Sequence, residues 1–189
     1  MPSRRAFVAG LIAAAGVPAS AANRLSPPKI GAIRWPGPGY DLHGYMAIPA
    51  KARGRQPAVL VLPDGGADTF ALGLTDALAV AGFVTCAPKT ALSFDEANAT
   101  LHWLATNAYS TGRVAAVGLG AGAALVERIA AGGSLSCGVL YDGAAGDVAK
   151  VTPLLHLPPP SSIDAARYAA AWRDAIGFLA THLQPPRRG

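Results

Sequence analysis

The 189-residue sequence predicts an α/β protein with a mostly parallel sheet and helices on both faces. Apolar runs of strand length alternate with helix-length segments, and several of these runs are continuously apolar, as in strands buried on both faces. Hydrophobic residues make up 51% of the chain, which is enough for one core. Repeated strand and crossover-helix units place strands in parallel, so we expect one domain of this class.

The expected elements follow one another in a regular order. Two alternating stretches, "IGAIRWPG" and "DLHGYMAIPA", are bounded by Gly and Pro and suggest a hairpin. The apolar run "PAVLVLPDGG" then predicts a buried parallel strand that ends in a glycine turn. Helices are expected over about residues 70–81, 94–107, 121–131 and 163–183, and strands in "FVTCAP", "RVAAVG", "CGVLYDG" and "VTPLLHL".

Local signals mark two of the helix ends. Ser93 and Glu96 have the spacing of a capping box, in which each side chain accepts a hydrogen bond from the other residue's amide. Gly132 and Gly133 are expected to end the preceding helix.

Residues 1–22 have the features of a secretory signal: a basic start, a short apolar run and small residues before a cleavage site. "SRRAFV" resembles the twin-arginine export motif, with Arg4 and Arg5 as the pair, and an ordinary signal is the alternative. We expect a periplasmic or secreted protein without a stable membrane anchor after cleavage. The remaining chain divides into residues 23–39, a linker with the start of the first strand, a domain over 40–184 and a basic tail over 185–189.

The charge pattern argues against a nucleic-acid partner. The formal charge of +5 falls to +3 when Arg4 and Arg5 are removed. The other basic residues form no face with interleaved aromatic residues. The oligomeric state is not indicated by the sequence.

Cysteine and histidine spacing implies neither a metal nor a cofactor. The four histidines and two cysteines lack ligand spacing such as C-x-x-C. Cys86 and Cys137 fall in expected strands, so two buried thiols are favoured over the disulfide that an exported protein could form.

The stretch "RVAAVGLGAGAAL" predicts a strand, a glycine turn and a helix, and the turn has three interpretations. Gly118, Gly120 and Ala123 fit a dinucleotide-binding fingerprint, with Asp142 at the end of the next strand. Such a fingerprint usually opens its domain, whereas here several elements precede it, so an NAD-binding enzyme is the least favoured interpretation.

The second interpretation is a nucleophile elbow, G-x-Nuc-x-G, in which Gly118 and Gly122 flank the nucleophile. Gly120 stands in the nucleophile's place and has no side chain that could attack a substrate. The third interpretation is a turn used only for close packing, which would leave a noncatalytic ligand- or partner-binding protein.

The order of "GYMAIPA", "PAVLVLPDGG", "GRVAAVGLGAGAAL", "CGVLYDG" and the last helix resembles the dienelactone hydrolase family, from about Tyr40 to Leu183. The resemblance implies an α/β-hydrolase-like three-layer sandwich and hydrolysis of a small ester or lactone through an acyl-enzyme. It also places two other strands between the two cysteines.

When the family's functional positions are matched to this sequence, the resemblance places the nucleophilic cysteine at Gly120 and one oxyanion donor at the Ala121 amide. The second donor would come from the turn at Asp64, Gly65 or Gly66, where the family often has a carboxylate in the place of Asp64. The family's acid and histidine come from two late loops separated by a strand, for which this chain has hardly any room. The remaining candidates for these two groups are His156, Asp142 and Asp164.

We expect Arg4→Lys combined with Arg5→Lys to leave the precursor in the cytoplasm, because a twin-arginine signal depends on the pair. Cell fractionation and immunoblotting would measure this against the unchanged chain. Normal export of the double variant would instead favour an ordinary signal.

Overall fold

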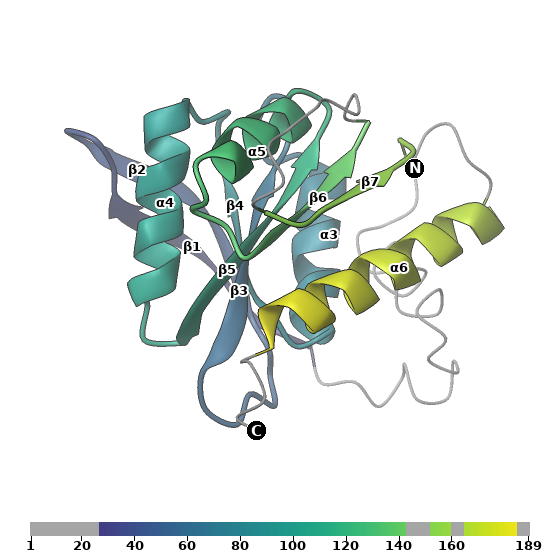
Figure 1. Cartoon of the computed structure of the whole chain (residues 1–189). Helices are drawn as coiled ribbons and strands as arrows, with labels where there is room; N and C mark the ends of the chain where they lie inside the picture. The colour runs from purple at the N-terminus through teal and green to yellow at the C-terminus, as the bar shows by residue number, and fades with distance from the viewer. Residues whose placement is uncertain (1–26, 143–151, 160–164, 185–189) are drawn as a thin grey trace, which may run out of the picture.

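The computed structural model describes residues 27–142, 152–159 and 165–184 (Figure 1). The expected signal over 1–22 and the basic tail over 185–189 lie outside the described residues. The described elements, in chain order, are β1 (Lys29–Pro36), β2 (Asp41–Ile48), β3 (Gln56–Leu62), α3 (Thr69–Val80), β4 (Val84–Pro88), α4 (Phe94–Thr106), β5 (Ser110–Leu119), α5 (Ala121–Ala131), β6 (Cys137–Tyr141), β7 (Leu154–Leu157) and α6 (Ala165–Leu183).

These strands form one mixed sheet in the order β1-β2-β4-β3-β5-β6-β7. The β1–β2 and β2–β4 pairs are antiparallel, and the β3–β4, β3–β5, β5–β6 and β6–β7 pairs are parallel. The predicted hairpin and the predicted parallel strands are therefore confirmed. β1 lies within the segment 23–39, which was expected to hold a linker and the start of the first strand, and it pairs with β2 along its whole length.

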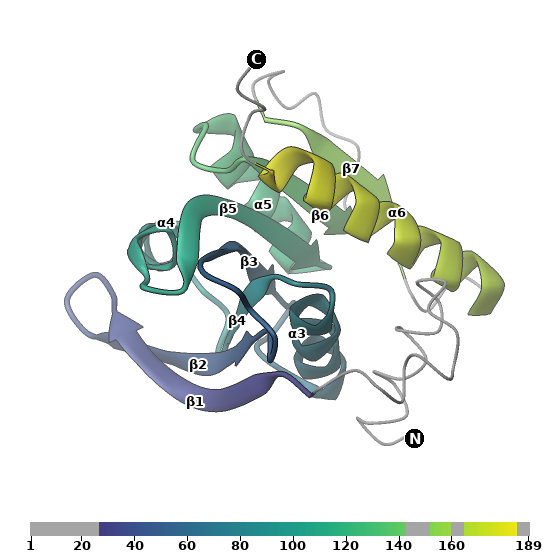
Figure 2. The same cartoon turned by 90° about the horizontal axis from the view of Figure 1, so that it is seen from below.

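The sheet has helices on both faces, as a mostly parallel sheet requires. Figure 2 shows α4 and α5 on one face and α3 and α6 on the other. One cluster of buried side chains includes Leu60, Leu101 and Val126, and a second cluster on the opposite face includes Val59 and Trp172. Neighbouring residues of a strand point to opposite faces, so β3 supplies both cores. The predicted three-layer α/β sandwich is confirmed.

The capping box at the start of α4 is confirmed. The Ser93 hydroxyl accepts a hydrogen bond from the Glu96 amide at 3.3 Å, and the Glu96 carboxylate accepts one from the Ser93 amide at 2.7 Å. Tyr40, at the tip of the β1–β2 hairpin, also donates its hydroxyl hydrogen bond to Glu96. These bonds fix the first turn of α4 and join it to the tip of the β1–β2 hairpin.

Two glycines let α5 pack directly on the sheet. A Cβ atom added to Gly122 would lie 1.9 Å from the carbonyl oxygen of Leu62, and one added to Gly118 would lie 2.4 Å from the Cα of Ala123. Real Cβ atoms essentially never come this close to other heavy atoms, and the atoms that they would meet belong to the backbone. A residue larger than glycine at either position would therefore push α5 away from β3 or β5.

The two cysteines lie on different strands and opposite faces. Cys86 is in β4 and Cys137 is in β6, with β3 and β5 between them. Both are buried and unbonded, which confirms the expectation of two free thiols. Burial raises the pKa of both thiols, that of Cys137 to about 12.

A search of the described helices for membrane spans found none with the length and hydropathy that crossing a bilayer requires.

We expect Gly122→Ala to lower the free energy of unfolding by about 3 kcal/mol or more, because the new methyl group overlaps a backbone oxygen. Gly177→Ala is the matched control, since Gly177 is exposed in α6 and has open space at its Cβ position. That control should gain roughly 0.5–1 kcal/mol from helix propensity. Thermal and urea denaturation would measure both changes, and equal stability of the two variants would contradict the close packing.

We expect both native thiols to resist Ellman's reagent at pH 8 and both to react once the chain is unfolded. Thiols of an unfolded chain ionise near pH 8.5, whereas the native thiols keep their protons well above that pH. The unfolded state therefore binds fewer protons than the native state at high pH, so the free energy of unfolding falls as pH rises above about 8.5. Rapid labelling of the folded protein would contradict this burial.

Candidate active site

The turn between β5 and α5 lies at the carboxyl edge of the central parallel strands, where ligands bind in open α/β sheets. Gly120 has φ 56° and ψ −121°, a strained combination that a residue with a side chain rarely adopts. Its amide donates to the Tyr141 carbonyl at 3.1 Å, and its own carbonyl accepts from the Ala123 amide at 2.9 Å. The backbone thus has the sharp strand-to-helix bend of a nucleophile elbow, with glycine at the nucleophile's position.

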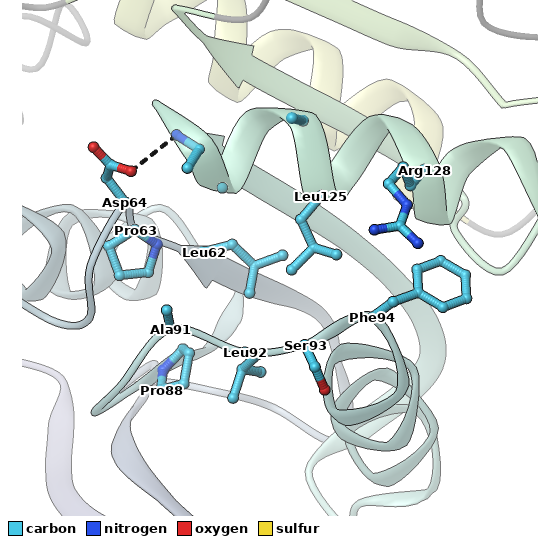
Figure 3. Close-up of a pocket in the computed structure, with 13 residues that line it drawn as sticks. Leu62, Pro63, Asp64, Pro88, Ala91, Leu92, Ser93, Phe94, Leu125 and Arg128 are labelled. Carbon is cyan, nitrogen blue, oxygen red and sulfur yellow. Dashed lines mark hydrogen bonds between the residues drawn. The ribbon is translucent and has the colours of Figure 1, made fainter.

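The carboxylate of Asp64 lies beside this position. A Cβ atom on Gly120 would lie 3.2 Å from both Cγ and Oδ2 of Asp64. Oδ1 of Asp64 accepts a hydrogen bond from the Ala121 amide at 3.2 Å, as Figure 3 shows. Asp64 therefore contacts the space that a nucleophile would occupy and uses the amide that would serve as an oxyanion donor.

Helix geometry explains why an anion lies here. The first amides of α5 have no partner within the helix and carry the positive end of its dipole. Asp64 follows β3, the parallel neighbour of β5, so the two strand ends bring its carboxylate to the start of α5. The hydrogen bond is at the long end of the normal range, and Asp64 is exposed, so solvent or a ligand can compete for the Ala121 amide.

The remaining residues of this turn are two glycines. A Cβ atom on Gly66 would lie 2.5 Å from the Lys89 carbonyl oxygen, and Gly66 has φ 123°, so the turn packs closely against the end of β4. Gly65 is exposed and has open space around it. Neither glycine amide donates to a described residue.

Asp142 and His156, one expected acid and the expected histidine, lie at neighbouring strand ends of β6 and β7. His156 is exposed in β7, level with Leu140 of β6, and its backbone is therefore two strand spacings, or about 10 Å, from β5. Asp142 follows β6 with φ 63°, a conformation that Asp tolerates, and its amide donates to Leu157 at 3.2 Å. No hydrogen bond or ion pair joins His156, Asp142 and Asp64 to one another.

Asp164 lies outside the described residues. Within the part of the chain that the structure describes, β7 is the last strand, and α6 follows it. The strand that the resemblance implies between the acid and histidine loops is therefore missing from the described region. The same region holds no group of three or more His, Cys, Asp or Glu side chains that could bind a metal ion.

Two tyrosines lie behind the elbow in the core between the sheet and α6. The hydroxyls of Tyr141 and Tyr168 are buried without a hydrogen-bond partner among the described residues. Burial is the main cause that raises the pKa of both hydroxyls, and the proximity of Tyr168 raises that of Tyr141 further. Both phenols therefore stay protonated at neutral pH.

A groove of about 260 Å³ with a mixed polar and apolar lining extends from Asp64 along α5 to the first turn of α4 (Figure 3). At its far end Arg128 lies over the ring of Phe94, 4.9 Å from the ring centre. Arg128, Phe94 and Leu125 are not among the site residues expected from the sequence. The available signal was the helical spacing of residues 121, 124, 125 and 128, which share one face of α5.

The dinucleotide interpretation conflicts with this arrangement. A pyrophosphate would bind at the start of the helix that follows Gly118 and Gly120. That place is held by the Asp64 carboxylate, whose charge repels a phosphate.

Comparisons with solved structures identify the fold. The chain is similar to a dienelactone hydrolase-like promiscuous phosphotriesterase from metagenomic libraries, with a TM-score of 0.68 and 16% identity over 84% of this chain and 100% of that one. It is also similar to a thermostable esterase from Pseudomonas putida, with a TM-score of 0.65 and 15% identity over 98% of this chain and 91% of that one. No protein-family model matches the sequence, and a comparison with curated proteins found no significant relative.

These two structures match this chain over most of its length, and identities of 15–16% establish a shared fold alone. The resemblance stated from the sequence is therefore confirmed at the level of architecture. The chain has the fold of the α/β-hydrolase superfamily, the superfamily of dienelactone hydrolase-like proteins and esterases.

Proposed function

We propose that this protein binds small esters or lactones at its α/β-hydrolase site and hydrolyses them weakly or not at all. The observation that carries the proposal is the Asp64 carboxylate, which lies against position 120 and accepts the Ala121 hydrogen bond. Gly120 offers no atom that could form an acyl-enzyme. Three features support binding of an ester or lactone: the elbow, the amides of Gly65 and Gly66 in the preceding turn, and the adjacent groove.

Any hydrolysis would depend on backbone donors. A substrate carbonyl oxygen that replaced Oδ1 of Asp64 would accept the hydrogen bond of the Ala121 amide, and Gly65 or Gly66 would supply the second donor. Two such donors stabilise the negative charge that develops on the carbonyl oxygen when water attacks. Under this proposal Asp64 inhibits the reaction, because it competes for the Ala121 amide.

The position of Asp64 also favours a second candidate, direct hydrolysis with Asp64 as a general base. Its Oδ2 faces the space where a nucleophile would stand, so a water molecule there could transfer a proton to the carboxylate as it attacks the substrate carbonyl. This route forms no acyl-enzyme. It makes Asp64 essential rather than inhibitory, so the two candidates predict opposite effects of removing its carboxylate.

We further propose that the protein acts outside the cytoplasm, on the basis of the signal-like residues 1–22.

We expect the wild-type protein to turn over p-nitrophenyl acetate and an enol lactone at or near the background rate. Asp64→Ala should raise kcat/KM, by up to about a hundredfold, because it frees one oxyanion donor. Asp64→Asn should raise it less, since the amide oxygen can still accept from Ala121. The assay would be run with each variant at equal folded concentration, checked by circular dichroism.

The matched variants separate the candidates. His156→Ala should leave the rate unchanged, and Gly120→Ser or Gly120→Cys should restore little, because an unactivated side chain is a weak nucleophile. A fall of a hundredfold or more in both Asp64 variants would establish the general-base candidate instead. Robust wild-type turnover that His156→Ala abolishes would overturn both candidates and make His156 the base.

A further inference from the structure

We infer that the amino edge of the sheet docks this protein on a membrane surface that carries acidic phospholipid headgroups. Four exposed cations, Lys29, Lys51, Arg53 and Arg55, form a row along this edge, the basic row. Exposed apolar side chains lie on both sides of it. This edge is the end of the molecule opposite the elbow, so the inference goes beyond the proposed function and does not depend on it.

The register of the sheet brings the basic row together. Lys29 begins β1 and pairs with Ile48, the last residue of β2. The connection from β2 to β3 carries the other three cations and lies at the lower end of the molecule in Figure 1. β3 begins at Gln56, so the row lies where the parallel strands start. The charge pattern of the sequence does not reveal it, because Lys29 is distant from the other three cations along the chain.

The charge of the basic row is not neutralised within the described chain. All four side chains are exposed, and none forms an ion pair with a described residue. The segments 27–30, 49–57 and 107–113 contain no Asp or Glu. An acidic surface is therefore attracted to the amino edge and repelled from the carboxyl edge, where most of the described carboxylates lie. Those at the carboxyl edge are Asp41, Asp64, Asp68, Asp95, Glu96 and Asp142.

Two large apolar side chains are exposed beside the basic row. Ile30 in β1 is 55% exposed. Tyr109 is 54% exposed, and its carbonyl accepts a hydrogen bond from the Gln56 amide at 2.8 Å, so it lies next to the start of β3. The β1 and β5 ends of the edge are four strand spacings apart, or about 19 Å, with the cations between them. Tyr40, exposed to a similar degree, lies at the opposite edge and donates to Glu96.

An acidic lipid surface fits both features of this edge. Anionic headgroups pair with the cations, while aliphatic and tyrosine side chains enter the boundary between headgroups and acyl chains. A nucleic acid or an acidic protein would neutralise the charge and leave Ile30 in water. β3 spans about 20 Å from Gln56 to Leu62, so a chain docked in this way turns the elbow away from the membrane and leaves it open to solvent.

The test measures co-sedimentation of the full chain with phosphatidylcholine vesicles that contain about 30% phosphatidylglycerol or none. We expect binding to the acidic vesicles alone, and weaker binding as salt is added. Each cation near an acidic membrane contributes about fivefold to the affinity. Lys51→Gln combined with Arg53→Gln and Arg55→Gln should therefore weaken binding by about a hundredfold.

The matched control combines Lys89→Gln, Arg128→Gln and Arg173→Gln. It removes the same charge from one lysine and two arginines that are exposed away from the amino edge, so the affinity should stay within a few fold of the wild type. Every variant keeps residues 1–22, so any contribution of that segment is common to all of them. Circular dichroism would check that each variant is folded.

Two further measurements make the result specific to a lipid surface. Ile30→Ser and Tyr109→Ser should each weaken binding to the acidic vesicles by roughly threefold or more, because each removes apolar area from the contact. Tyr40→Ser is the control at the opposite edge and should leave binding unchanged. Gadolinium-chelating lipids in the same vesicles should broaden the amide NMR signal of Arg53 and leave that of Ala121 unaffected.

Several outcomes would overturn the inference. These are equal binding of the wild type and the variant that lacks the three loop cations, equal binding to vesicles with and without phosphatidylglycerol, and stronger broadening at Ala121 than at Arg53. A DNA duplex or polyglutamate that bound as tightly as the acidic vesicles, with no effect of Ile30→Ser or Tyr109→Ser, would show a general polyanion site and overturn it too. None of these outcomes bears on turnover, because no residue of the elbow is changed.

Discussion

The contact between Gly122 of α5 and the Leu62 carbonyl at the end of β3 determines where the site can form. Because no side chain lies between the Gly122 backbone and the Leu62 carbonyl, the start of α5 lies directly above the ends of the parallel strands. The bend at Gly120 and the exposure of the Ala121 amide both follow from this approach. The same approach brings Asp64, which directly follows Pro63 at the end of β3, within hydrogen-bonding distance of that amide.

The bend at Gly120 has the backbone geometry of a nucleophile elbow without a side chain at its apex, because the bend depends on the backbone and on the glycines around it. Gly120 tolerates its conformation at less cost than a residue with a side chain would. Asp64 supplies an anion to the positive end of α5, so this helix end is compensated. This contact stabilises the start of the helix and occupies the Ala121 amide at the same time.

The groove along α5 is formed by residues of three elements. Its walls come from β3, the β4–α4 connection and α5, which are held by the core and by the capping box at Ser93 rather than by catalytic residues. Arg128 and Phe94 form one polar end, and Asp64 forms the other.

The sequence by itself determined the order of strands and helices, the three-layer class, the capping box at Ser93 and Glu96, and the elbow spacing of Gly118, Gly120 and Gly122, because these features follow from local periodicity and backbone conformation. It also indicated buried, unbonded cysteines. It did not determine that Asp64 faces Gly120, that His156 lies about two strand spacings from β5, or that Arg128 and Phe94 close one end of a groove. Those relations join residues on different elements, and only the register of the sheet and the packing of α4 and α5 on it decide which of them meet.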